Sequence, residues 1–234
     1  MAPLPPERFT VKKRVFTASA VDYLGPLYVK VNRSRQKRWI CLFTCLSTRA
    51  IHLEKVHSLS TDSFIKAYLR FNYTRGFSLR TLYSDNATCF KGADNELKAA
   101  IANLDQKQIC HTLRAHGITW IFHPPLASHQ AGVVERQVRT VRKVFMAKQV
   151  TTMDKIFKTV QARPYGVTND EDLDTLLKEA ELIVNSRPLT PISDSPDDFA
   201  ALTPLTIMTS ILHPDAPVDE FCNGEVLLKS LPAT

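Results

Sequence analysis

The chain has 234 residues, 44% of them hydrophobic, and a formal net charge of +7. This length suits one large domain, or one domain with an appendage, and no run of roughly 18 or more apolar residues predicts a membrane span. The five cysteines are scattered without a Cys-x-x-Cys pair, which favours reduced thiols in a cytosolic or nuclear protein over a disulfide framework.

The charge is divided unevenly along the chain. Residues 1–150 hold 24 Lys and Arg against 9 Asp and Glu, a balance of +15. Residues 151–234 hold 6 against 14, a balance of −8. A basic front half suggests contact with a polyanion such as nucleic acid. An ordinary solvated surface is the alternative, and charge alone does not decide between them.

The first predicted elements form an antiparallel meander. A Pro-rich and then basic lead-in occupies residues 1–14, and residues 15–31 are predicted to form a strand that bulges near Gly25-Pro26. A polar turn over residues 32–38 then leads into two mostly apolar strands, WICLFTCLS and TRAIHLEKV. Short connections of this kind are typical of neighbouring antiparallel strands.

The rest of the chain alternates between helices and strands. Ser60-Thr61-Asp62 predicts the start of a helix, and Gly76 predicts its end. Apolar residues recur at helical spacing within that helix, at Phe64, Ala67, Tyr68 and Phe71. Further on, the predicted elements are a strand SLRTLY, a helix over 93–115 with a break near 103–105, a strand GITWIF, a loop HPPLASHQAGV, and the helices VVERQVRTVRKVFMAKQ and EDLDTLLKEAELIVNSR. The first of these two helices is amphipathic, with Val134, Val138, Val141 and Phe145 on one stripe. We therefore expect an α/β core over residues 15–190 and a Pro-rich, acidic C-terminal extension over 191–234.

Three acids stand at informative places. Asp22 lies inside the first predicted strand, Asp85 directly follows the fourth, and Glu135 lies near the start of a helix. A mixed sheet with the first and fourth strands as parallel neighbours would bring Asp22 and Asp85 together, with Glu135 approaching from a packed helix. Three such carboxylates repel one another unless a divalent cation neutralises them, and Mg²⁺ prefers oxygen ligands. Such a triad can hold two ions about 3.5–4 Å apart.

Other interpretations of these residues remain open at this point. A turn aspartate or a surface glutamate is the alternative for each acid taken singly. Ser84 and Cys89 have no obvious paired base, so a covalent intermediate is not predicted. Cys41 and Cys45 fall in an apolar strand and are interpreted as core residues.

The sequence resembles the integrase catalytic core of long-terminal-repeat retroelements, within the retroviral integrase superfamily and most closely the BEL/Pao retrotransposon group. The resemblance rests on five segments in order, FTASAVDYLGPL, CLFTCLSTRAIHLEKVHSLSTDSFIKAYLRF, LYSDNATCFKGA, HGITWIFHPPLASHQAGVVERQVRTVRK and NSRPLTPISDSPDDFAALTP. It implies an RNase H-like fold, with a five-stranded mixed sheet flanked by helices. It places the family's Asp-Asp-Glu triad on Asp22, Asp85 and Glu135, which would bind two Mg²⁺ or Mn²⁺ ions.

The resemblance also implies an activity and partners. The activity is polynucleotidyl transfer: an endonucleolytic cleavage near the 3′ end of the element's DNA, then attack of the freed 3′-hydroxyl on a phosphodiester of the target. The implied partners are double-stranded DNA, both element ends and target, and further copies of the chain. The implied location is the nucleus, with the cytoplasm during element replication, and no membrane is involved.

Several residues near the triad are expected to assist it. Arg139, Arg142 and Lys143 lie one and two turns beyond Glu135 and can share its side of the helix, where the family holds phosphates of the DNA end. His129 is expected to contact DNA. The family's pattern also suggests that Asn86 supports the site by hydrogen bonding.

Two classes of function follow from the sequence. The first is an active, metal-dependent DNA integrase, which the intact triad favours. The second is a transposon-derived DNA-binding or scaffold protein that keeps the fold without catalysis. Ala87 stands where the family usually has glycine, which leaves the second class open.

Overall fold

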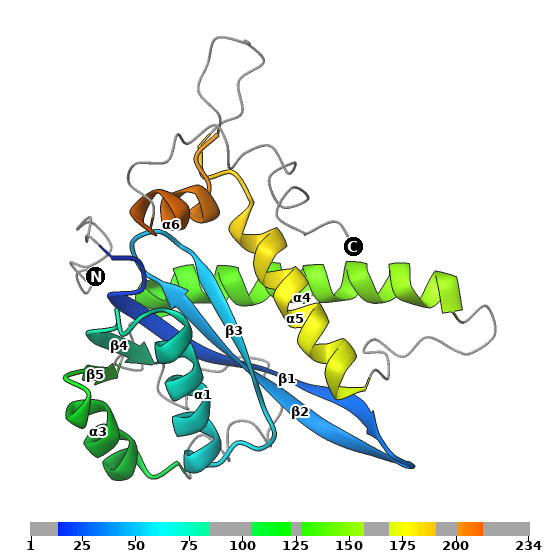
Figure 1. Cartoon of the computed structure of the whole chain (residues 1–234), viewed down its shortest axis with the longest axis horizontal. Coiled ribbons are helices and arrows are strands. Elements are labelled where there is room, and N and C mark those ends of the chain that lie inside the picture. Colours follow the sequence, from blue (N-terminus) through cyan, green and yellow to red (C-terminus); the bar gives the residue numbers. More distant parts are fainter. Residues whose placement is uncertain (1–13, 85–103, 123–127, 157–168, 191–200, 213–234) are drawn as a thin grey trace, which may run out of the picture.

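A computed structural model of the chain describes residues 14–84, 104–122, 128–156, 169–190 and 201–212. Its centre is a five-stranded mixed sheet with the strand order β3-β2-β1-β4-β5 (Figure 1). The strands are β1 (Ala18–Val31), β2 (Ser34–Cys45), β3 (Ile51–Val56), β4 (Thr81–Ser84) and β5 (Thr119–Phe122). The predicted antiparallel meander of β1, β2 and β3 is confirmed. The parallel pairing of the first and fourth strands is also confirmed, with Val21 beside Ser84.

Strand β1 changes register with β2 between Leu24 and Leu27, which confirms the predicted bulge. Gly25 is required there, because its φ is +128° and a Cβ atom would lie 3.0 Å from the Trp39 ring. Side chains alternate between the two faces of a strand, and the bulge shifts that alternation by one residue. Leu24 and Leu27 therefore belong to the same hydrophobic cluster.

Helices cover both faces of the sheet. Within the described residues, the helices are α1 (Thr61–Thr74), α3 (Gln106–Ala115), α4 (Ser128–Ile156), α5 (Asp170–Asn185) and α6 (Pro204–Leu212). Helices α1 and α3 pack on one face, and α4 and α5 pack on the other. The predicted loop over residues 123–133 is partly wrong, because α4 already begins at Ser128. No helix in the described ranges has the length and apolar character that crossing a membrane requires.

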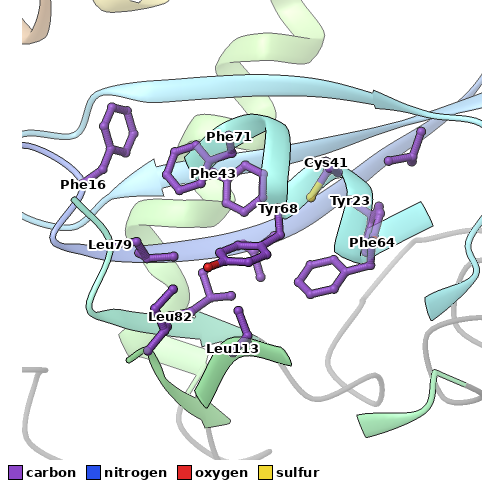
Figure 2. Packing of buried hydrophobic residues seen from close by; sticks show 14 of the residues in the cluster. Phe16, Tyr23, Cys41, Phe43, Phe64, Tyr68, Phe71, Leu79, Leu82 and Leu113 are labelled. Carbon is purple, nitrogen blue, oxygen red and sulfur yellow. The ribbon is translucent and has the colours of Figure 1, made fainter. Parts of the chain in front are cut away.

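The core on the α1 face is aromatic (Figure 2). The Ser60 side chain accepts a hydrogen bond from the Ser63 backbone N–H and caps α1, as predicted. One stripe of α1 then buries Phe64, Tyr68 and Phe71, with the Phe71 ring stacked on Phe43 at 4.2 Å between centroids. Fully burying each such side chain contributes about 1.5–3 kcal/mol, so this stripe fixes α1 against β1 and β2. Met208 of α6 joins the same cluster, although α6 lies within the predicted C-terminal extension.

Side chains of α5 provide hydrogen-bond partners for backbone groups on the free edge of β3. Asn185 accepts a hydrogen bond from the Ile51 N–H at 2.8 Å and donates one to the Ile51 carbonyl at 2.9 Å. The Glu181 carboxylate accepts a third from the Leu53 N–H at 3.4 Å. An uncovered edge strand would expose these groups to pairing with other chains, so α5 closes this side of the sheet.

The first turn of α5 also anchors the β1–β2 hairpin at Arg38. The buried guanidinium of Arg38 donates two hydrogen bonds to Asp170, from Nε at 2.9 Å and from Nη2 at 2.7 Å. Lys55 lies 3.1 Å from the same carboxylate and 2.8 Å from Asp174. The Arg38 hydrogen bonds, followed by those from Lys55, hold the pKa of Asp170 well below its usual value.

Replacing Asp170 by Asn should lower the free energy of unfolding by about 2 kcal/mol at neutral pH, because Arg38 stays buried without its charged partner. The wild-type Asp170 carboxylate contributes fully to stability above the pKa of about 4 that it has in the unfolded chain. That contribution is lost as the pH falls towards the lower pKa of the folded state. The difference between the two proteins, measured by urea unfolding, should therefore shrink below pH 4. Asp174→Asn, at a more exposed partner of Lys55, is the control and should cost less than about 0.5 kcal/mol. Equal costs for the two variants would contradict the anchor.

Candidate active site

Asp22 lies on the face of β1 that α4 covers. Ala20 and Leu24, two residues to either side of it, belong to the clusters built with α4. Because alternate residues of a strand share a face, the Asp22 side chain points to that same side. It is half-buried, and its Oδ1 accepts a hydrogen bond from the Tyr23 N–H at 2.7 Å. The predicted position of Asp22 inside a strand is confirmed.

The end of β4 lies directly beside this part of β1. Ser84 pairs with Val21, the residue that precedes Asp22, and with Phe122 of β5. The Trp120 indole donates a 2.8 Å hydrogen bond to the Ser84 hydroxyl, which fixes the strand end. Sequence reasoning missed this contact, because nothing in the spacing of a Ser and a Trp 36 residues apart predicts it. Strand pairing and this hydrogen bond therefore hold the end of β4, which precedes Asp85 in the sequence, close to Asp22.

Helix α4 crosses the same region. Its Val134 shares a buried cluster with Ala18 and Ala20 of β1 and with Tyr83 of β4. Farther along, Val141 packs in the cluster of Leu24 and the rest of the hairpin, and Val138 contacts both clusters. The predicted stripe of Val134, Val138, Val141 and Phe145 is confirmed as the face that packs on the sheet. Asp22 therefore lies between the two apolar clusters that hold α4.

Gln137 fixes the rotation of α4 about its axis. It is 1% exposed, donates a 3.2 Å hydrogen bond to the Arg49 carbonyl, and accepts one from Arg187. Arg49 lies in the connection between β2 and β3, so this flank of α4 faces that side of the sheet. At 3.6 residues per turn, Glu135 lies about 160° around the helix from Gln137. Glu135 therefore lies on the opposite flank, which faces β4, and it is exposed.

The predicted phosphate-binding residues share that flank or border it. Arg139 and Arg142 lie within about 40° of Glu135 around the helix, and Lys143 lies about 80° away. All three side chains are exposed. The other flank is basic as well: burial lowers the pKa of the Arg187 guanidinium, and the like charges of Arg49 and Arg136 lower it further. The surface around α4 is thus positive on both flanks.

Some predicted site residues lie outside what the structure describes. Asp85 and Asn86 fall in residues 85–103, and the side chain of His129 is not described, although its backbone belongs to the first turn of α4. Within the described ranges, no group of three or more His, Cys, Asp or Glu side chains has the geometry of a metal site. The predicted triad includes Asp85, which lies outside those ranges.

The donor set of the described acids suits a hard divalent cation. Asp22 and Glu135 supply carboxylate oxygens from two packed elements, and Mg²⁺ and Mn²⁺ favour such ligands. The nearby thiol of Cys41 does not compete, since it is fully buried on the opposite face of the sheet. Burial raises the pKa of the Cys41 thiol, and the charges of Glu54 and Asp22 raise it further, which keeps the thiol neutral. Its predicted place in the core is confirmed.

Comparisons with known proteins identify the fold. No protein-family model matches the sequence, and no curated protein matches it. The chain is similar to a chain of the simian T-cell lymphotropic virus intasome, determined by cryo-EM in complex with PP2A regulatory subunit B56 gamma, at 12% identity and a TM-score of 0.53. That match covers 93% of this chain, which spans only 63% of the matched chain. The catalytic core domain of BIV integrase matches at 16% identity with a TM-score of 0.51, covering 85% of this chain and 97% of the other. The chain therefore has the RNase H-like fold of integrase catalytic cores, a five-stranded mixed sheet flanked by helices.

Proposed function

We propose that this chain is a polynucleotidyl transferase that integrates retroelement DNA, with Asp22, Asp85 and Glu135 as its catalytic and metal-binding residues. One observation supports this most strongly. Asp22 lies on the α4-facing side of β1, beside the end of the strand that leads directly into Asp85, and Glu135 occupies the flank of α4 towards that strand. Asp22 and Glu135, which are distant in sequence, thus lie on neighbouring elements beside the strand end that Asp85 follows in the sequence.

Two Mg²⁺ or Mn²⁺ ions, when bound by these carboxylates, would activate the attacking oxygen and stabilise the leaving oxygen of a phosphodiester. The chain's own contribution is to hold the acids in place. Asp22 is fixed by the pairing of β1 with β2 and by the Tyr23 N–H, and Glu135 is fixed through the packing of Val134 and Val138. In-line displacement at phosphorus depends mainly on such positioning and on charge neutralisation.

DNA is the proposed partner, as element ends and as target. Arg139, Arg142 and Lys143 would bind phosphates beside Glu135, where contacts position the duplex without reading its sequence. His129, at the start of the same helix, would contact DNA, and Asn86 would support Asp85. We further propose that the chain derives from a BEL/Pao-type element, works as a homo-oligomer and acts in the nucleus.

The function is tested by Mn²⁺ titration and by a strand-transfer assay with Mg²⁺ or Mn²⁺ on the element's terminal DNA. We expect the wild-type chain to bind Mn²⁺ and to join DNA ends to a target duplex. The double variant Asp22→Asn/Asp85→Asn should lose both properties, because it removes two of the three negative charges. Equal Mn²⁺ affinity in the two proteins would refute the metal site. Duplex binding with no strand transfer under any metal would instead identify a catalytically silent DNA-binding protein.

A further inference from the structure

The β1–β2 hairpin continues beyond the rest of the sheet as a two-stranded ribbon (Figure 1). Residues 27–31 of β1 pair with residues 34–38 of β2. The strands on either side of the hairpin do not reach this part. Strand β4 pairs only with residues 18–21 of β1, and β3 pairs only with residues 39–44 of β2. The predicted turn over residues 32–38 is therefore wrong for most of its length, because β2 already begins at Ser34.

One face of this ribbon is packed. Leu27, Val29 and Val31 lie against the cluster that includes Leu173 and Leu177 of α5. Arg38 on the partner strand is tied to the first turn of α5 through Asp170. These contacts with α5 hold the ribbon in place and cover one of its two faces.

The opposite face is open and positively charged. Lys30 is directly opposite Arg35 in the register, and Tyr28 is directly opposite Lys37, so these four side chains share one face. All four are exposed, as is Arg33 in the turn. In the described part of the chain, no carboxylate forms an ion pair with Lys30, Arg33 or Arg35. Like charges directly opposite each other destabilise a strand pair, and a bound polyanion would relieve that repulsion.

We propose that this open face, the ribbon face, binds the phosphate backbone of duplex DNA at a place separate from the acidic site. The choice of DNA as the polyanion rests on the proposed function. A two-stranded ribbon is narrow enough to enter the major groove, and residues two apart along a strand are about 6.4–6.8 Å apart. Cations on both strands can thus meet successive phosphates along a DNA strand.

The position of the ribbon face makes it a remote support for the duplex. Lys30 lies eight residues beyond Asp22 along β1, which corresponds to roughly 25 Å. Contacts at that distance add affinity and fix orientation but touch no reacting group. Their loss should weaken DNA binding and make it less dependent on salt, since each neutralised phosphate contributes about 0.9 to the slope of log K against log salt.

The test compares two triple variants that remove the same charge from the full chain. Lys30→Ala/Arg33→Ala/Arg35→Ala changes the ribbon face. The control, Lys66→Ala/Arg80→Ala/Arg114→Ala, removes one exposed lysine and two exposed arginines from the α1–α3 side of the molecule. Binding of a fluorescent 30-base-pair duplex is measured by anisotropy in EDTA over a range of salt concentrations. A duplex of 30 base pairs spans roughly three helical turns.

The ribbon variant should lower the salt slope by about 2.7, the value for three lost phosphate contacts, while the control should keep most of the wild-type slope. Both variants should fold, and urea unfolding should show the ribbon variant to be no less stable than wild type, because it loses the Lys30–Arg35 repulsion. An unchanged slope in the ribbon variant, or an equal fall in the control, would overturn the proposal. The measurement needs no divalent metal, so an absence of strand transfer would remove the proposed activity and leave this result standing.

Discussion

Replacing Glu135 by Gln should abolish 3′-end processing and strand transfer while leaving the affinity for duplex DNA close to that of wild type. Gln keeps the size of Glu and its ability to hydrogen-bond, but it removes one of the three charges that would hold the divalent ions. If the transition state loses several kcal/mol of stabilisation by the ions, the rate falls at least about a thousandfold. Folding should be unaffected, because Glu135 is exposed and the buried stripe of α4 is unchanged.

The assay requires variants that separate catalysis from binding. Glu171→Gln, at an exposed glutamate of α5, controls for the loss of one negative charge and should retain strand transfer. Arg139→Ala and Lys143→Ala should show the reverse of Glu135→Gln, with weaker DNA binding and a salt slope lower by roughly one unit for each lost contact. Near-normal strand transfer by Glu135→Gln would remove Glu135 from the site.

The largest loss of stability is expected from Glu181→Ala. The Glu181 carboxylate lies 3.3 Å from the fully buried His52 ring, accepts a hydrogen bond from Arg75, and accepts another from the Leu53 N–H. Removing it takes the acidic partner from the buried His52 ring and from the partly buried Arg75 guanidinium, although Glu54 still binds His52 at 2.8 Å. Breaking a buried ion pair from one side costs about 3–5 kcal/mol, a large part of the stability of an ordinary domain.

Urea unfolding of Glu181→Ala, with Glu171→Ala as an exposed control on the same helix, measures this cost. The control should lose less than about 1 kcal/mol, the usual value for an acid near a helix start. Burial alone would raise the pKa of Glu181, but the hydrogen bond and charge of His52, with the charge of Arg75, bring it below the usual value. The contribution of Glu181 is therefore present above its unfolded pKa of about 4 and is lost as the pH falls below it. A cost below 1 kcal/mol at neutral pH would show that the network contributes little.

Local patterns in the sequence predict much of the fold. The Ser60 cap, the apolar stripes of α1 and α4, and the bulge at Gly25 all depend on residues close together in the chain, and all are confirmed. The start of α4 was mispredicted because Gly132 and the two prolines before it favour a loop. Gly132 is exposed, with nothing within 4 Å of the place where a Cβ would lie. A single exposed glycine costs a helix only about 1 kcal/mol, which the packing of the following stripe outweighs.

The rest could not be predicted because it depends on contacts between distant segments. Nothing local indicates that Gln137 fixes the rotation of α4 through Arg49, or that Trp120 holds Ser84. The side of the sheet towards which Glu135 faces follows from the first of these contacts. The pairing of residues 34–38 with β1 after the bulge likewise depends on a register shift that the polar sequence conceals.

The closure of the β3 edge by α5 has a consequence for the order of events during synthesis. The backbone groups of Ile51 wait for a side chain 134 residues later in the chain. At a translation rate of about 5–20 residues per second, Ile51 is synthesised roughly 7–27 seconds before Asn185. During that interval an unpaired strand edge, with His52 and Glu54 beside it, is exposed to other nascent chains. Chains that end before α5 should therefore aggregate, however well the strands themselves are formed.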